Sequence, residues 1–206
     1  MAAAILNEAD RGRIRQAVAT AEAKTAGEIF TVVAEESDDY RFIPILWATL
    51  IALIVPLPLI FLTLWPASLI FLAQLAAFVV LALVASHPAG RPAVVPPAVK
   101  HGAARSLAVR QFLAHGLHTT EARTGVLIFV SLAERHAEII ADAGISAKVD
   151  DGVWQAAMER LLAEIRAGRL ADGLIAAIES TSTVLARHFP PRPGDRNELP
   201  NDLVLL

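Results

Sequence analysis

The chain has 206 residues, of which 55% are hydrophobic and 19% charged, and it contains no cysteine. This composition, with a mean hydropathy of +0.51, excludes an intrinsically disordered chain, a disulfide-stapled secreted domain and a site built on cysteine thiolates. The formal net charge is −3, and neither the part before residue 43 nor the part after residue 85 carries a basic excess. We therefore expect no nucleic-acid partner.

Residues 1–41 are expected to supply the first helix and the first strand of a folded domain. Apolar residues recur at near-helical spacing between residues 5 and 24, which predicts an amphipathic helix. Residues 28–33 are rich in β-branched and aromatic side chains, which predicts a strand. An acidic connector from Glu35 to Asp39 follows this strand.

A long uncharged stretch comes next, with no Asp, Glu, Lys or Arg between Arg41 and His87. Its length is enough to cross a bilayer twice, because one helical span needs about 20 residues. Trp65-Pro66 suits the turn, since Trp favours the headgroup region and Pro is common at helix starts. We therefore expect a transmembrane hairpin over residues 42–86, with spans near 43–64 and 67–86.

Basic residues flank this hairpin on its two outer sides and are absent from its turn. Lys24 and Arg41 precede it, and Arg91, Lys100 and Arg105 follow it. Because basic residues are retained on the cytoplasmic side, both polar parts of the chain are expected there. The sequence thus predicts a multi-pass protein of the cell (inner) membrane with two cytoplasmic termini.

The remaining chain begins with a proline-rich linker over residues 87–97 and continues as a folded segment over 98–189. A helix is predicted first, followed by an apolar strand at 126–130, a hairpin strand at 135–141 and two closing helices. The tail, residues 190–206, is expected to be irregular.

Neither polar segment has enough structure to bury a sheet face by itself. Joining them solves this problem, and it predicts an α/β fold with a small mixed sheet of about three strands flanked by helices. Strand 28–33 would lie parallel to strand 126–130. The two-helix transmembrane hairpin would interrupt this fold directly after its first strand.

Several segments of the polar sequence resemble the TPM domain family. They are Thr25-Ala-Gly-Glu-Ile-Phe30, Arg123-Thr-Gly-Val-Leu-Ile-Phe-Val-Ser131 with Glu134-Arg135 after it, Ile140-Ala-Asp-Ala-Gly-Ile145, and Trp154. The resemblance implies an α/β sandwich like the one expected above. The family includes an acid phosphatase of the thylakoid lumen and a photosystem repair factor, so the resemblance implies either phosphatase chemistry or a role in assembly.

Four acidic residues are candidates for a divalent metal site. Asp142, Asp150 and Asp151, joined by Glu28, would offer hard oxygen ligands for Ca²⁺ or Mg²⁺. The resemblance supports this hypothesis, because some members of the family carry divalent metals bound to Asp. The alternative is structural, with Asp150 or Asp151 as the N-cap of the helix that contains Trp154 and Asp142 as a turn residue.

The common strong catalytic and phosphate-binding motifs are missing from the sequence. No catalytic residue is therefore assigned, and no cofactor is expected apart from the candidate metal ion. The interpretation that fits best is a membrane-anchored interaction or assembly module, whose partners are the lipid bilayer and either another protein or further copies of this chain. The alternatives are a metal-assisted acid phosphatase and a subunit of a membrane transport complex.

Overall fold

The computed structural model describes residues 6–87, 94–191 and 197–206, and the chain forms two compact units. One unit combines Met1–Ser37 with His101–Leu206, and the other is Asp38–Lys100. Because the second unit is inserted into the first, the first unit is assembled from two separate segments of the chain. Part of the expected linker, residues 88–93, lies outside the described residues.

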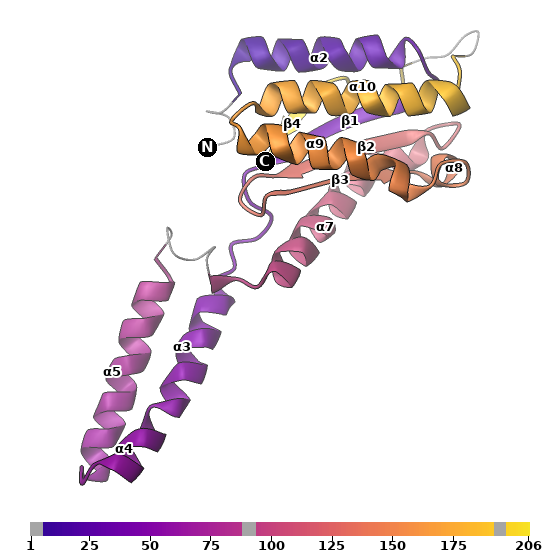
Figure 1. The fold of residues 1–206 in the computed structure, drawn as a ribbon. Helices are drawn as coiled ribbons and strands as arrows, with labels where there is room; N and C mark the ends of the chain where they lie inside the picture. Colours follow the sequence, from indigo (N-terminus) through magenta and orange to yellow (C-terminus); the bar gives the residue numbers. More distant parts are fainter. Residues whose placement is uncertain (1–5, 88–93, 192–196) are drawn as a thin grey trace. The chain divides into compact units, whose positions relative to one another are not determined.

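The first unit is built on a mixed sheet with strand order β3-β2-β1-β4 (Figure 1). β1 (Glu28–Ala34) runs parallel to β2 (Gly125–Ser131), and β3 (His136–Ala141) pairs antiparallel with β2. Every residue of β1 and β2 is buried, as expected for central strands covered on both faces. The predicted α/β class and the parallel pairing of the first two strands are confirmed.

The fourth strand corrects the sequence prediction, which had about three strands and an irregular tail. β4 (Leu203–Leu205) lies in that tail and pairs parallel with β1. The backbone N–H of Leu206 donates to the Val33 carbonyl over 3.0 Å, and the N–H of Glu35 donates to the Leu206 carbonyl over 2.9 Å. A strand of three residues has too little alternation to be recognised, and its structure depends on pairing with β1.

Helices cover both faces of the sheet (Figure 1). On one face lie α2 (Glu8–Glu22), α9 (Gln155–Arg166) and α10 (Leu170–His188), and on the other lies α7 (Pro97–Ala114). The core under the three helices includes Ile14, Val18, Ile29, Val33, Ile128, Leu161, Leu174, Ile178 and Leu185. The core under α7 includes Phe30, Val32, Ala104, Ala108, Phe112, Leu127 and Phe129.

Short elements complete the first unit. They are η1 (Leu117–Thr119), α8 (Ala143–Ser146) and η2 (Asp151–Trp154). Gly116 ends the α7 region with a left-handed φ of 69°. Gly125 begins β2 where the backbone passes close to η1, since a Cβ atom there would lie 2.3 Å from the Leu117 carbonyl oxygen. Packing therefore requires glycine at position 125.

The second unit is a pair of apolar helical segments. α3 (Phe42–Ile54) and α4 (Pro56–Leu62) together match the first predicted span, and α5 (Ala67–Ala85) matches the second. Pro56 is the first residue of α4, and Val55, between the two segments, keeps helical dihedral angles of φ −52° and ψ −43°. Only 11% of the first stretch and 6% of the second is buried. Their length and apolar composition suggest association with a membrane.

Candidate functional site

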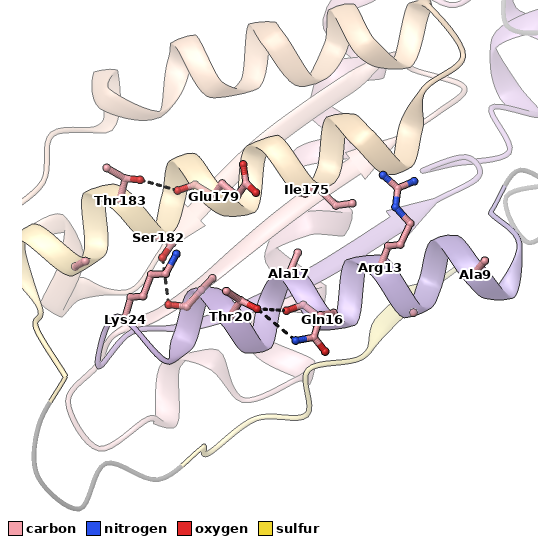
Figure 2. A pocket seen from close by; sticks show the side chains of 13 residues that line it. Ala9, Arg13, Gln16, Ala17, Thr20, Lys24, Ile175, Glu179, Ser182 and Thr183 are labelled. Carbon is pink, nitrogen blue, oxygen red and sulfur yellow. Dashed lines mark hydrogen bonds between the residues drawn. The ribbon is translucent and has the colours of Figure 1, made fainter.

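A groove with a volume of about 1090 Å³ lies between α2 and α10. Figure 2 shows that side chains from both helices line it. The two walls consist of Ala9, Gly12, Arg13, Gln16, Ala17, Thr20, Ala21 and Lys24 from the α2 side, and Ile175, Glu179, Ser182, Thr183 and Ala186 from α10.

Two polar contacts hold the helices in a fixed register. The Arg13 guanidinium binds the Asp172 carboxylate over 2.6 Å, and the Ser182 hydroxyl donates to the Ala21 carbonyl over 3.1 Å. Arg13 precedes Ala21 in α2, and its partner Asp172 precedes Ser182 in α10. The two helices therefore run parallel. The hydrogen bond and charge of Asp172 raise the pKa of Arg13 above its ordinary value, so its positive charge is retained at all physiological pH values.

The lining of the groove is suited to binding. Thr20 and Thr183 donate their hydroxyl hydrogens to carbonyls of their own helices, at Gln16 over 2.8 Å and at Glu179 over 2.9 Å. Small side chains on both walls allow a ligand to approach the helix backbones closely. The charged side chains among the lining residues are Arg13, Lys24 and Glu179.

The structure places two of the predicted metal ligands as helix caps. Asp142 precedes α8, and its Oδ1 accepts a hydrogen bond from the Ala143 N–H over 2.6 Å. Asp150 precedes η2, and its Oδ1 accepts from the Gly152 N–H over 2.8 Å. The structural alternative predicted the cap at Asp150, whereas it expected Asp142 to be a turn residue and the structure makes it the cap of α8. Asp151 begins η2, and its side chain lies outside the described part of the structure.

Glu28 and Asp142 lie at the same end of the sheet on either side of β2. Glu28 pairs with Gly125 in the β1–β2 ladder, and the Asp142 N–H donates to the Gly125 carbonyl over 2.9 Å. Asp142 Oδ2 is buried and accepts no hydrogen bond among the described residues. However, no three His, Asp or Glu side chains in the described ranges form a group that could hold an ion. The Asp151 side chain is not among those described, so the metal hypothesis stays a prediction.

A buried polar cluster of Ser37, Ser131 and Glu134 lies at the opposite end of the sheet. The Ser37 N–H donates to Glu134 Oε1 over 3.1 Å, and the Ser37 and Ser131 hydroxyl oxygens are 2.7 Å apart. The Ser131 hydroxyl also donates to Glu134 Oε2. Glu134 is 6% exposed and Ser131 is fully buried. Since these hydroxyls and the carboxylate bind one another, the cluster has a structural explanation.

An unpredicted carboxylate is Glu22, at the end of α2. Its Oε1 accepts a hydrogen bond from the Ile29 N–H over 3.0 Å. Burial, together with the nearby charge of Glu28, raises the pKa of Glu22 from an ordinary 4.5 to about 7. The C-terminal segment reaches the same region, because the Glu198 N–H donates to Glu28 Oε1 over 3.2 Å. Glu22 is therefore partly protonated at neutral pH.

Comparison with known proteins finds a family model that matches part of the chain and a solved structure with a similar fold. Residues 93–184 match the model of the TPM domain. The NMR structure of the BA42 protein from the psychrophilic bacterium Bizionia argentinensis is similar, with a TM-score of 0.62 over 98% of this chain and 95% of that chain. The two sequences are 19% identical, so this likeness shows the fold alone. No curated protein matches the chain.

Proposed function

Because this chain is a TPM domain protein with two apolar helical segments inserted after its first strand, we propose that it is a membrane-anchored interaction module. The inserted segments anchor it in the bilayer, and the α2/α10 groove binds a helix of a partner protein. The observation that carries the binding role is the groove itself, which is open, wide and lined by helix surfaces.

The anchoring role is supported by apolar side chains that are exposed in the described part of the structure. Phe42 is 86% exposed and Phe61 is 81% exposed, and they belong to a set of exposed Leu, Ile, Val, Phe and Trp residues along α3, α4 and α5. Exposed apolar area of this extent is unfavourable in water by about 25 cal/mol per Å². Burial in lipid removes that cost, since each segment is long enough to span the hydrocarbon core.

The occupant of the groove is expected to be an α-helix with small or apolar residues on its docking side. Two parallel helices with small side chains form a groove between them. A third helix can pack in this groove with its axis about 8–10 Å from the axis of each of the two helices. Exposed Lys24 and Glu179 lie on opposite walls, and Arg13 is already bound to Asp172. A matching helix would therefore present an acidic side chain to Lys24 and a basic one to Glu179.

The groove is tested by introducing single thiols, which the cysteine-free sequence makes simple. Gln16→Cys and Thr183→Cys place a thiol on each wall, and Leu113→Cys on α7, which is 53% exposed, is the matched control on the other face of the sheet. Maleimide labelling is measured in permeabilised cells and in the full chain purified in detergent. We expect the two groove thiols to react several-fold more slowly in cells, and the control thiol to react alike in both. Equal rates for groove and control thiols in cells would contradict the docking role.

A further inference from the structure

The outer strand β3 has one edge with no partner strand among the described residues. It pairs with β2 on one side, and it is the terminal strand in the order β3-β2-β1-β4. The Asp142 N–H donates to the Gly125 carbonyl over 2.9 Å, so these two residues form a hydrogen-bonded pair of the antiparallel ladder. Hydrogen-bonded and non-hydrogen-bonded pairs alternate from there along β3. Glu138 and Ile140 therefore direct their backbone groups to β2. Ala137, Ile139 and Ala141 direct theirs away from the sheet.

The surroundings of this edge leave room for another strand. A groove of about 440 Å³ runs along β3, with Arg105 of α7 on one side and Trp154 and Met158 on the other. The Ser146 hydroxyl donates to the outward carbonyl oxygen of Ala141 over 3.4 Å. A carbonyl oxygen has two lone pairs, so the Ala141 oxygen can accept a second hydrogen bond. Soluble proteins usually protect such edges with proline, lysine or a bulge, and β3 has neither proline nor lysine.

We propose that the β3 edge pairs with β3 of a second copy of this chain, antiparallel, with Ile139 on the two-fold axis. In this register Ala137 faces Ala141 of the other copy, and Ile139 faces Ile139. The N–H of each of these residues donates to the other copy, and the carbonyl of each accepts from it. Two four-stranded sheets would become one continuous sheet. An antiparallel pairing of identical strands is isologous, so it closes as a dimer and leaves no free β3 edge.

Charge complementarity favours a second copy as the occupant. Glu138 would face Ile140 of the other copy, so no two carboxylates would lie directly opposite each other. Within its own subunit the Glu138 carboxylate forms an ion pair with Arg105 at 2.8 Å. His136 would face Asp142 of the other copy, which places a basic group opposite an acidic one. Within its own subunit His136 Nε2 lies 3.4 Å from Glu138 Oε1, whereas Asp142 Oδ2 makes no hydrogen bond among the described residues.

The proposal predicts a specific cross-link in the full chain purified in detergent. Residues opposed in a hydrogen-bonded antiparallel pair have Cα atoms about 5.5 Å apart, which is within the range of about 4.4–6.8 Å that a disulfide spans. Ile139→Cys should therefore form a disulfide-linked dimer on mild oxidation, whereas Leu113→Cys on α7 should stay largely monomeric. Cross-linking of the two variants to the same extent, or of neither, would overturn the proposal.

A second variant tests the hydrogen bonds themselves. Ile139→Pro removes an N–H that makes no bond to β2, so the subunit loses no ladder hydrogen bond and loses only the packing of the Ile139 side chain against the core. Light scattering in detergent should give a dimer for wild type and a monomer for Ile139→Pro. A monomeric wild type, or a dimer that survives the proline, would overturn the proposal. If Ile139→Pro does not fold, the comparison of Ile139→Cys with Leu113→Cys tests the proposal by itself. The α2/α10 thiols report on a different face, so failure here leaves the proposed function standing.

Discussion

The Ser37 backbone N–H donates a hydrogen bond to Glu134 Oε1 over 3.1 Å, although the two residues are 97 positions apart in the chain. Ser37 is the last residue before the inserted unit, and Glu134 lies in the turn between β2 and β3. The Ser131 hydroxyl binds the other oxygen of the same carboxylate. This contact fastens the chain segment that precedes the apolar helices to the segment that follows them.

Replacing Glu134 with alanine should lower the free energy of unfolding by about 1–3 kcal/mol, because the Ser37 N–H and the Ser131 hydroxyl lose their buried acceptor. Glu134→Gln should cost less, since it keeps one acceptor oxygen. Chemical unfolding of the full chain in detergent measures the difference. The matched control is Glu159→Ala on the exposed surface of α9, expected within about 0.5 kcal/mol of wild type. Equal losses for Glu134→Ala and Glu159→Ala would show that the cluster is not stabilising.

The stability of the first unit should depend on the protonation of Glu22. Its pKa is raised to about 7 in the folded protein from an ordinary 4.5, so between these values the folded state binds a proton that the unfolded state has released. The free energy of unfolding should therefore fall as pH rises from about 4.5 to 7, and this contribution should level off above that range. Glu22→Gln keeps an oxygen for the Ile29 N–H and removes the titration. Melting curves across this range should decline more for wild type than for Glu22→Gln, and identical profiles would contradict the assignment.

The metal hypothesis makes a prediction that the capping role does not. If Ca²⁺ or Mg²⁺ binds through Asp142 with Glu28, Asp150 or Asp151, the ion should stabilise the folded chain by about 2.7 kcal/mol at 100 times its dissociation constant. Asp142→Asn should abolish this gain while its amide oxygen still caps α8. Melting with millimolar Ca²⁺ or Mg²⁺ and with chelator provides the measurement. The same shift in both proteins, or no shift in either, would leave Asp142 with its capping role alone.

The flanking charges predict that both termini are cytoplasmic. Fluorescent protein fused to the C terminus should fluoresce, and alkaline phosphatase fused there should be inactive, since that enzyme folds only after export. Alkaline phosphatase fused after Leu64, in the predicted turn, should be active and serves as the control. An active alkaline phosphatase at the C terminus would place that terminus outside the cytoplasm and contradict the prediction.

The sequence predicted the elements whose signals are local. β1 and β2 were recognisable because their β-branched and aromatic runs are continuous, and the two apolar stretches because they lack charge over their whole length. β4 was missed because its structure comes from pairing with β1, as the bonds of Leu206 to Val33 and Glu35 show.

The unpredicted side-chain contacts have the same origin in long-range packing. Ser37 and Glu134 meet only after the two halves of the domain join, and Glu22 is buried only where α2 meets β1 and the tail. The α2/α10 groove depends on two helices that are far apart in the sequence and pack in parallel. The small exposed residues of α2, such as Ala9 and Gly12, were the one local signal that pointed to it.

Alkaline carbonate extraction of membranes from cells that express the full chain tests the central claim, membrane anchoring by α3, α4 and α5, most directly. High pH strips proteins bound by charge or by other proteins and leaves integral proteins in the membrane pellet. We predict that the full chain stays in the pellet after carbonate and enters the supernatant only with detergent. Release of the chain by carbonate alone would contradict membrane anchoring.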